Sequence, residues 1–540
     1  MKRWFGVLIV VLLSFWVVRP LWGKSYFPMH DDTQVARVVV MGRALKQGQF
    51  PVRWVSDLGY GYGYPIFNFY GPLPYYVGGG LYAMGVDSIV ATKIMFGVGA
   101  LLAAVFCFLL LESVFGVLGG VVGSVLFVYA PYHAVDIYIR GAVGEYWAIA
   151  FLPLVLWGAL LVYQKNKKST GIVIGSLGLA GVIVSHTILG FITIALCIGG
   201  FLVSLVIKRL NRNLSAIAAM IIIGLGISAF FWLPAFVEMG ATGVSSMINE
   251  ASTGFSDHFV CIGQLWNSPW GYGGSAVGCI NDGVSFKLGK LQLGLTVLGL
   301  ILYKASPIMI IGFLLFIFSV LGMLDVSSAL WSRIPMVSFI QYPWRLLSFS
   351  IFSMAIIGGS VVVVLRKPII RLIWAVVIIS ACIAINAKLF QPQYLYTRDS
   401  KAFETPDDLR FRVSKISDEY LPVGIVKPAI PSDILKSPIE SNKSLAVRIV
   451  QDSDTYFRVE LQSADRQSVL INKAVFPGWQ YRINGQPVTP SISLGLPTVV
   501  VSEGTSLLEL RLINTPVRLW GNIISIASLM IIGGIAYYGV

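Results

Sequence analysis

Charged residues are scarce in this sequence: Asp, Glu, Lys and Arg together make up 12% of its 540 residues. Ordinary soluble domains carry about twice that share. Hydrophobic residues, in contrast, reach 56%. The composition therefore excludes an ordinary soluble globular protein and indicates a chain that lies largely inside a membrane.

Several motifs of soluble enzymes are also missing. The sequence has no GxxxxGK[ST] segment for a P-loop nucleotide site and no GxSxG segment for a serine hydrolase. Its histidines show neither HxxxH nor HExxH spacing, so no zinc site is indicated. The four histidines are His30, His133, His186 and His258.

Hydrophobic runs recur along the chain. A run of roughly 20 residues crosses the ~30 Å hydrocarbon core as a helix, and lipid offers the backbone no other way to satisfy its hydrogen bonds. The run after Lys2 and Arg3 is interpreted as a retained helix, because no small-residue cleavage site follows it. We expect about twelve transmembrane helices, at 4–22, 90–111, 116–134, 147–164, 170–187, 189–206, 214–233, 291–304, 306–323, 346–365, 369–387 and 518–538.

The net charge of +14 comes largely from short connections between these runs. Basic residues are enriched in cytoplasmic loops, which orients the chain. The N-terminus is then cytoplasmic, and loop one (23–88), the loop 238–290 and the polar stretch 388–515 lie outside. No basic face for nucleic acid remains. The basic residues are Lys2, Arg3, Lys165, Lys167, Lys168, Lys208, Arg209, Arg212, Lys304, Arg366, Lys367 and Arg371.

Two external segments have further features. The apolar stretch 72–86 contains three successive glycines and is too short to span, so it is expected to be interfacial or re-entrant. Cys261 and Cys279 fall in the same external loop, where a disulfide and two free thiols are both open. Cysteines in the apolar runs act as small hydrophobic residues.

The polar stretch 388–515 reads as a β-rich domain. Apolar and polar residues alternate in 445–449, 456–461, 470–475 and 507–512. Asn484-Gly485 lies between two such segments and predicts a tight hairpin turn. We expect a small antiparallel sandwich, tethered to the membrane at both ends, with the chain ending in a transmembrane helix within 516–540.

Loop one contains the most informative polar residues. Asp31 and Asp32 precede an amphipathic stretch, 33–46, that is typical of a helix in the membrane interface. The two aspartates either cap this helix or act as a general base or metal ligand. The run 59–76 alternates glycine with aromatic residues such as Tyr64 and Tyr70. It forms either an interfacial tyrosine belt or a binding pocket for sugar or lipid.

Two more polar clusters lie at the expected outer ends of membrane helices. Asp136 and Arg140 are four residues apart, so a helix places them on one face as an ion pair, and Glu145 begins the next apolar run. Arg345 follows Trp344 at the start of another run. The first cluster either holds two helix ends together or binds a substrate. Arg345 either binds a phosphate or anchors the helix in the interface.

These segments resemble a known family. MHDDTQ, GQFPVRW, GYGYPIFNFYGPLPYY, APYHAVDIYIRGAVGE and QYPWR are similar to bacterial membrane proteins named "6-pyruvoyl-tetrahydropterin synthase-related". FPGW and ING, at 476–479 and 483–485, resemble the related YfhO-like proteins. The acidic pair, the interfacial helix and the later Asp-Arg pair look like the GT-C superfamily of membrane glycosyltransferases. A pterin synthase needs a zinc-binding histidine set, which this sequence lacks.

The resemblance implies a GT-C-like fold and an inverting transfer of sugar from a polyprenyl-phosphate donor to an acceptor outside the cytoplasm. Asp31 would be the base, with Asp32 as the substitute. Arg140 and Arg345 would hold the phosphate, and Asp136 and Glu145 would orient them or bind a divalent cation such as Mg²⁺ or Mn²⁺. The alternative is a non-enzymatic protein of the cell envelope, either a flippase or transporter of lipid-linked glycans or an assembly scaffold.

Overall fold

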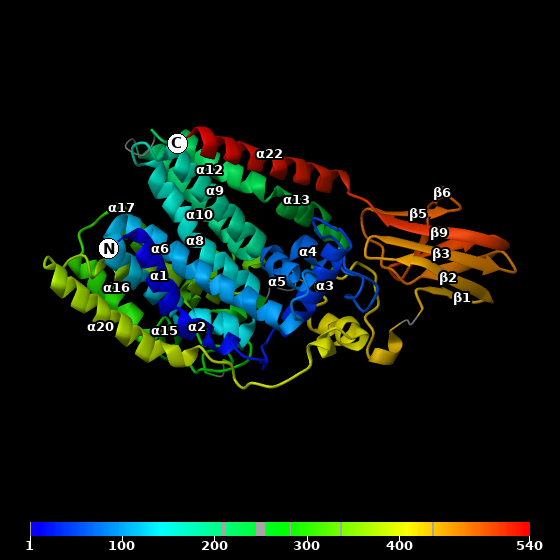
Figure 1. The fold of residues 1–540 in the computed structure, drawn as a ribbon, viewed down its shortest axis with the longest axis horizontal. Coiled ribbons are helices and arrows are strands. Elements are labelled where there is room, and N and C mark those ends of the chain that lie inside the picture. Colours follow the sequence, from blue (N-terminus) through cyan, green and yellow to red (C-terminus); the bar gives the residue numbers. More distant parts are fainter. Residues whose placement is uncertain are drawn as a thin grey trace.

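The computed structural model describes residues 2–207, 212–244, 254–280, 282–334, 337–434 and 437–539. A helical bundle occupies one end of an elongated molecule and a β-sandwich the other (Figure 1). Both chain termini lie at the end of the bundle that is far from the sandwich. The principal helices are α1 (Arg3–Leu13), α2 (Phe15–Val18), α3 (Gln34–Lys46), α4 (Ile66–Phe69), α5 (Leu73–Ala83), α6 (Ser88–Val128), α7 (Pro131–Ala134), α8 (Val143–Val162), α9 (Lys168–Ser185), α10 (Thr187–Val206), α12 (Leu214–Ile227), α13 (Ala229–Glu238), α15 (Ile262–Asn267), α16 (Lys290–Leu302), α17 (Pro307–Met323), α18 (Ser328–Trp331), α19 (Leu347–Ser360), α20 (Pro368–Asn386), α21 (Ser414–Ile416) and α22 (Pro516–Tyr538).

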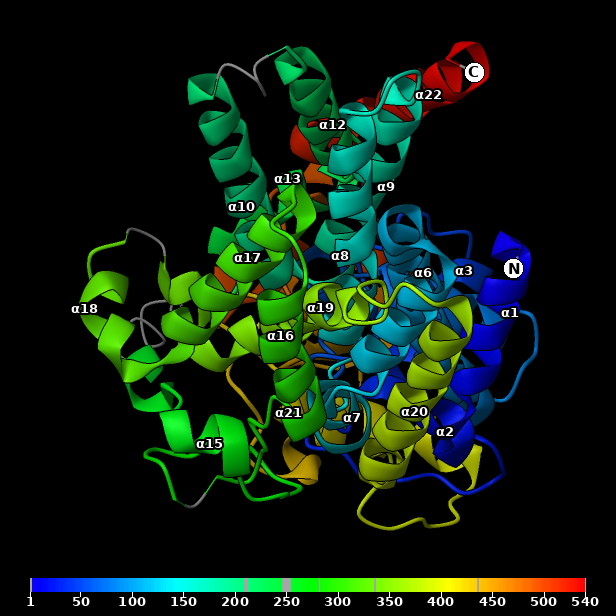
Figure 2. The same cartoon turned by 90° about the vertical axis from the view of Figure 1, so that its left-hand side faces the viewer.

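The bundle is that of a multi-pass membrane protein. Within the described residues, seven helices are long and apolar enough to cross a membrane, or up to eight if the bent pair α12–α13 is one span. Figure 2 shows α8 and α19 in the middle of the bundle and α1, α10, α20 and α22 around them. Every residue of α19 is buried, whereas most of α20 and α22 is exposed apolar surface. Such an exposed apolar surface suits contact with lipid.

The long helix α6 folds back on itself. Gly116 has φ 70° and ψ 177°, which interrupts the helix. The Ser124 hydroxyl donates to the carbonyl oxygen of Ala104 at 2.7 Å, although the two residues are twenty positions apart. The expected crossings 90–111 and 116–134 are thus two arms of one hairpin. Each of the twelve expected crossings contains helix, but α16, α17 and α19 are shorter than a full span, so the count of twelve stays a prediction.

Helices α3 and α5 pack closely on each other at the inner edge of loop one. A Cβ on Gly79 of α5 would lie 2.4 Å from Cγ of Met41 in α3, so only glycine permits this approach. α5 has 11 residues, which agrees with a segment too short to span. Ten of the thirteen residues of α3 are buried. The prediction of an interfacial helix with one face on the membrane is therefore wrong, because protein covers α3 on nearly all sides.

The C-terminal domain is a sandwich of two antiparallel sheets. One sheet has the order β1-β4-β8-β7 and the other β2-β3-β9-β5-β6. Buried side chains from both sheets, such as Val469 and Val459, form one core. The turn Asn484-Gly485 joins β5 to β6 with φ of 49° and 80°, as the hairpin prediction requires. The strands are β1 (Ile439–Ser441), β2 (Leu445–Asp452), β3 (Tyr456–Ser463), β4 (Gln467–Ile471), β5 (Trp479–Ile483), β6 (Gln486–Val488), β7 (Ser491–Ser493), β8 (Leu496–Val501) and β9 (Gly504–Leu512).

The first part of the predicted β-rich stretch has another structure. Residues 388–434, here called the linker, contain short helical turns and α21, and the named strands begin only at Ile439. The linker packs along loop one: Tyr396 forms a backbone bridge with Tyr26, and Arg412 pairs with Asp32 at 3.1 Å. It therefore belongs with the bundle rather than with the sandwich.

Loop one also provides the surface on which the sandwich docks. The ring of Trp54 lies 5.5 Å from Phe476 and 5.8 Å from Trp479, between centroids. Gly63 has φ 95°, and a Cβ there would lie 2.3 Å from the Trp54 ring. The glycine–tyrosine run thus positions aromatic residues for docking of the C-terminal domain. Of the two alternatives for this run, the membrane belt does not hold for Tyr64, which is 1% exposed inside the protein.

The last helix, α22, returns from the sandwich to the bundle. Its residue Arg518 donates through Nε and Nη2 to one carboxylate oxygen of Glu238, at 3.0 and 2.9 Å. Asn68 of loop one and Thr515 also donate to this carboxylate. Glu238 and Arg518 are almost completely buried, so their ion pair ties the end of the chain to α13.

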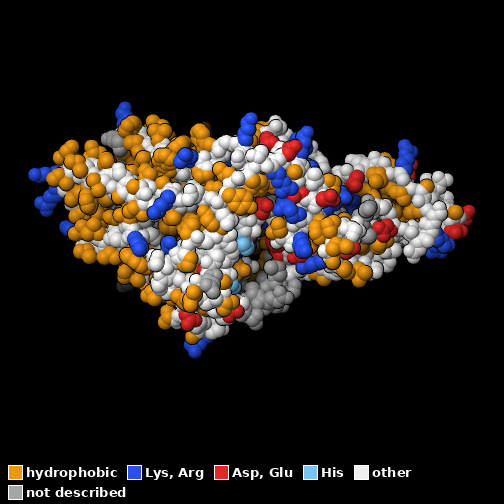
Figure 3. Space-filling view, turned by 90° about the horizontal axis from the view of Figure 1, so that it is seen from below, with side chains coloured by type: hydrophobic (Ala, Val, Ile, Leu, Met, Phe, Trp, Pro, Cys, Tyr) orange, Lys and Arg blue, Asp and Glu red, His pale blue; other side chains and the backbone are white. Residues whose placement is uncertain are grey.

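Charge is distributed unevenly along the molecule. On the face in Figure 3, apolar side chains cover the bundle half, Lys and Arg gather at its far end, and both signs mix over the half that carries the sandwich. Arg3 pairs with Glu112 near the turn of the α6 hairpin, and the backbone at Gly539 lies against Ser169. Both termini therefore share one end with the basic connection 165–168.

Candidate functional site

The candidate site lies where loop one meets the turn after the α6 hairpin. The backbone N–H groups of His30 and Asp31 donate to the carbonyl oxygens of Ile139 and Arg140, at 2.8 and 2.9 Å. Arg140 ends a π-helical turn, η2 (Val135–Arg140), and Gly141 follows with φ 69°. α8 then runs for 20 residues, about 30 Å, from the site toward the basic connection 165–168. The site and that connection are thus separated by about one bilayer thickness.

Arg140 is the centre of a buried polar cluster. Its Nη1 donates to Asp136 at 2.7 Å, to Glu145 at 2.9 Å and to the Tyr132 hydroxyl at 3.2 Å. The other face of the guanidinium lies over the Trp344 ring, 4.5 Å from its centroid. Both carboxylates are completely buried, whereas the Arg140 side chain keeps 11% of its surface exposed. The Nη2 and Nε groups make no hydrogen bond among the described residues and remain available to a ligand.

Glu145 joins Arg140 to Arg345. The Nε of Arg345 lies 3.8 Å from Glu145, while its Nη1 donates to the carbonyl oxygen of Ile340 and to the side chain of Gln341. The same Arg345 Nε is buried and has no hydrogen-bond partner among the described residues. Sequence positions 136, 140, 145 and 345 are thus brought together. The ion-pair interpretation of Asp136 and Arg140 is confirmed in geometry, and a substrate-binding role stays a prediction.

The two adjacent aspartates point to different partners. Asp31 bonds to Nδ1 of His30 at 2.8 Å and its side chain is 43% exposed. Asp32 is 24% exposed and pairs with Arg412 of the linker. Neither side chain caps the helix α3, whose first turn lacks a side-chain cap. Asp31 is therefore the more exposed of the two aspartates, and Asp32 holds the linker.

The charges around Asp31 favour its ionised form. Burial raises the pKa of Asp31, but the hydrogen bond with His30 and the positive charge of Arg140 outweigh burial, so the pKa lies below its ordinary value. The hydrogen bond to Asp31 raises the pKa of His30. Burial keeps the pKa of Asp32 above its ordinary value despite Arg412. Asp31 is therefore ionised at neutral pH and can accept a proton.

Two residues that the sequence interpretation missed lie beside Asp31. Arg37 of α3 is 4% exposed and donates to the Ser417 hydroxyl at 2.8 Å. Ser417 donates in turn to the carboxylate of Glu419 at 2.9–3.0 Å. Burial and, to a smaller extent, the charge of Asp31 raise the pKa of Glu419, while burial raises the pKa of the neighbouring Tyr420 against the charge of Arg345. Nothing in the sequence signals these contacts, because about 380 positions separate α3 from the linker.

The two predicted tyrosines have different positions. Tyr70 lies beneath the Arg37 guanidinium, with 4.3 Å between the ring centroid and the guanidinium carbon. Burial raises the pKa of Tyr70, and the charge of Asp31 acts in the same direction. Tyr64 is buried, and its hydroxyl accepts a hydrogen bond from the backbone of Tyr420. The structure thus brings Tyr70 to the site and keeps Tyr64 behind it as a support for the linker. His186 also lies nearby, where its Nδ1 accepts from the N–H of Leu189 at the start of α10.

Cation ligands do not converge at the site. No group of three His, Cys, Asp or Glu side chains within the described ranges has the arrangement of a metal site. Asp31 and Asp32 diverge, and Arg140 already engages Asp136 and Glu145. The residues present do not fit a divalent cation, so the predicted Mg²⁺ or Mn²⁺ stays a prediction without a ligand set.

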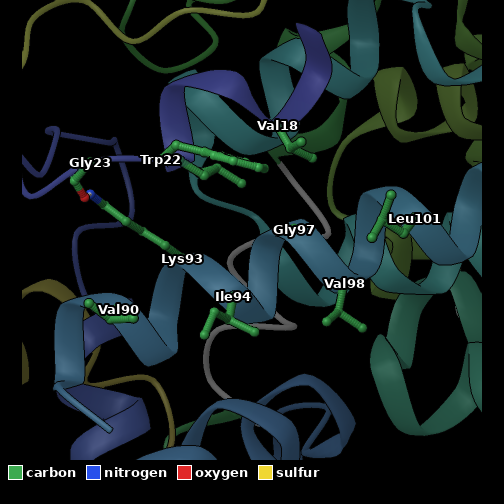
Figure 4. A pocket seen from close by; sticks show the side chains of 10 residues that line it. Val18, Trp22, Gly23, Val90, Lys93, Ile94, Gly97, Val98 and Leu101 are labelled. Atoms are coloured by element: carbon green, nitrogen blue, oxygen red, sulfur yellow. The ribbon is translucent and has the colours of Figure 1, made fainter. Parts of the chain in front are cut away.

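Two further features, of which the sequence predicted only the cysteine pair, lie away from this cluster. Cys261 and Cys279 form a disulfide in the loop between α13 and α16. Lys93 of α6 donates to the carbonyl oxygens of Gly23 and Ser25, which fixes the start of loop one. Figure 4 shows Lys93 beside an apolar groove of about 440 Å³ between the end of the first span and α6.

Fold and site together define a multi-pass membrane protein with a polar cluster at one end of its bundle. A family model described as "6-pyruvoyl-tetrahydropterin synthase related domain; membrane protein" matches residues 67–391. The match covers more than half of the chain, and the chain belongs to this family. It includes positions 140, 145 and 345 but neither Asp31 nor the sandwich.

Similarity to individual proteins is low. An uncharacterized protein of Lactococcus lactis subsp. cremoris is 23% identical over 47% of this chain and 42% of its own length. The chain thus spans less than half of that relative. The mycobacterial arabinofuranosyltransferase AftD has a TM-score of 0.47 at 14% identity, over 74% of this chain and 28% of AftD. The Archaeoglobus fulgidus oligosaccharyltransferase has 0.46 at 14% identity, over 81% and 59%. TM-scores below 0.5 do not establish a common fold.

Proposed function

We propose that this protein is a membrane glycosyltransferase that moves a sugar from a polyprenyl-phosphate donor to an acceptor outside the cytoplasm. The observation that carries the proposal is one exposed, ionised carboxylate, Asp31, hydrogen-bonded through its backbone to Arg140, whose guanidinium keeps free donors. A hydroxyl nucleophile needs a base within reach, and a phosphate leaving group needs cationic donors. The GT-C resemblance of the motifs agrees with this chemistry.

The proposed reaction is a single displacement. The acceptor hydroxyl oxygen attacks C1 of the sugar as Asp31 takes the hydroxyl proton. The bond between C1 and the phosphate oxygen breaks, and its electron pair leaves with the polyprenyl phosphate. Arg140 and Arg345 donate hydrogen bonds to that phosphate, and Glu145 holds the two guanidiniums in place. Attack opposite the leaving group inverts the configuration at C1.

The positive charges of the proposed phosphate-binding arginines are already neutralised by neighbouring carboxylates. Asp136 and Glu145 already offset the charges of Arg140 and Arg345, so the free N–H groups rather than a net positive charge would recognise the phosphate. Trp344 covers one face of Arg140 and excludes water there. Hydrogen bonds in such a low-dielectric site are stronger than in water.

Transfer can be tested with purified protein in liposomes, an envelope fraction as acceptor and a panel of radiolabelled undecaprenyl-phosphate sugars. We expect transfer from one donor of the panel and a loss of roughly 10²–10⁴-fold in Asp31→Asn, which is the range of a lost general base. Asp32→Asn is the matched control and should keep most of the activity. Full transfer by Asp31→Asn would remove the proposed base. Binding of every donor without transfer would favour a flippase or scaffold.

A further inference from the structure

The linker brings a second carboxylate, that of Glu419, to the side of the site where Arg37 lies. Its oxygens accept from the Ser417 hydroxyl and from the backbone of Glu419 itself, and Glu419 is partly exposed. A carboxylate has about four acceptor positions, so part of its capacity is unused. Burial raises the pKa of Glu419, and the charge of Asp31 acts in the same direction. Arg37, which bonds to Ser417, also donates to the Tyr75 hydroxyl, Tyr75 donates to Gln34, and Gln34 donates to the carbonyl oxygen of Asp31. Hydrogen bonds thus connect the two acidic residues within one polar region.

Aromatic rings form the walls beside these carboxylates. The Tyr420 ring stacks on Phe69 with centroids 5.6 Å apart, which fixes its orientation. Tyr70 is held between Arg37 and Tyr75. Flat rings beside hydrogen-bond acceptors suit a sugar, which presents C–H groups on its faces and hydroxyls around its edge.

The charged side chains around this region restrict the class of molecule that can bind there. An anionic group would be repelled by Asp31 and Glu419, and a cationic group would meet Arg37 directly behind Ser417. A neutral molecule with several hydroxyls avoids both penalties, because each carboxylate accepts hydrogen bonds from hydroxyl groups.

We propose that Glu419 binds the acceptor, and that the acceptor is a neutral sugar whose neighbouring hydroxyl donates to Glu419 while Asp31 deprotonates the attacking one. This inference rests on the proposed glycosyl transfer. It assigns the donor side to Arg140 and Arg345 and the acceptor side to the linker. The linker is then part of the active site rather than a tether.

Two measurements on the same variants distinguish the donor side of the site from the acceptor side. Binding of undecaprenyl phosphate reports the donor side, and label transfer to the envelope fraction reports the complete reaction. Glu419→Gln should bind undecaprenyl phosphate within about twofold of wild type and lose roughly 10- to 100-fold in transfer, as expected for one hydrogen bond to a charged group. Glu419→Asp should recover part of the transfer.

The matched control is Glu404→Gln, a linker carboxylate bonded to Tyr82 and near Arg43, which should leave both measurements unchanged. Linkage analysis of the labelled product should find the new bond on a sugar. Full transfer by Glu419→Gln, loss of undecaprenyl-phosphate binding with it, or label attached to an amino-acid side chain would each overturn the inference. None of these outcomes affects the proposed transfer, which fails only if Asp31→Asn stays active or wild type transfers nothing.

Discussion

The backbone N–H of Asp31 donates to the carbonyl oxygen of Arg140 at 2.9 Å, across 109 positions of sequence. The contact involves only main-chain atoms, so side-chain substitutions at either position leave it in place. The proposed base and the proposed phosphate ligand are therefore fixed relative to each other. Substitutions at these two positions therefore test the chemistry of the side chains and not their placement.

The buried carboxylate of Glu145 should be essential to the bundle. Glu145→Ala leaves Arg140 and Arg345 without their shared partner, and breaking a buried pair typically costs about 3–5 kcal/mol. Ser348→Ala removes only one hydrogen bond to the same carboxylate, about 1 kcal/mol. Thermal unfolding in detergent should show a large fall of the midpoint for the first variant and a small one for the second. Equal midpoints would contradict the central position of Glu145.

Two neighbouring glycines of α5 should respond in opposite ways to alanine. A Cβ at Gly79 would meet Met41 at 2.4 Å, whereas a Cβ at Gly80 would have nothing within 4 Å. Gly79→Ala should destabilise by about 1–3 kcal/mol through overpacking. Gly80→Ala should stabilise by about 0.5–1 kcal/mol, because alanine favours the helix. Chemical denaturation of both variants measures the difference, and a stable Gly79→Ala protein would show that α3 and α5 lie further apart.

Docking of the sandwich should depend on pH through Asp454. Its carboxylate accepts from the N–H of Ser56 in loop one at 2.7 Å, and burial raises the pKa of Asp454 to about 6. Because the folded-state pKa exceeds the unfolded one, the stabilisation is complete below about pH 4 and is lost as the pH rises through about 6. Wild type should therefore lose stability between about pH 4 and about pH 6 relative to Asp454→Asn. Parallel stability curves for the two proteins would rule out this titration.

Orientation can be tested with single cysteines. Lys167→Cys lies in a basic connection and Glu440→Cys in the sandwich, so a membrane-impermeant maleimide should label them from the cytoplasm and the exterior, respectively. Replacing the partly buried Cys197 removes background, since Cys107 and Cys382 are buried. Labelling of both positions from the same side would invalidate the orientation.

Local patterns in the sequence were sufficient to predict much of the fold. The crossings 90–111 and 116–134 were separable because each is long and apolar, although the structure joins them through Gly116. Asn484-Gly485 specified its hairpin through two positive-φ positions. Asp136 and Arg140 were paired by helical spacing. In each case, the deciding interaction lies within a few residues along the chain.

Contacts between distant segments could not be predicted in this way. Arg37 and Glu419 meet through Ser417, and no local rule links an arginine in loop one to a carboxylate in the linker. The amphipathic pattern of 33–46 predicted a helix in the membrane interface, but its apolar residues Val38 and Val39 are completely buried inside the protein. Tyr64 looked available for a ligand because its covering residue, Tyr420, is 356 positions away.

The ion pair between Glu238 and Arg518 has a consequence for biosynthesis. Arg518 is made 280 residues after its partner, once the sandwich has been synthesised. Until then, Glu238 at the end of α13 lacks its ion-pair partner, and an unpaired carboxylate is costly to bury. We therefore expect the nascent bundle to remain open at this position, where chaperones or proteases could reach it, until α22 inserts.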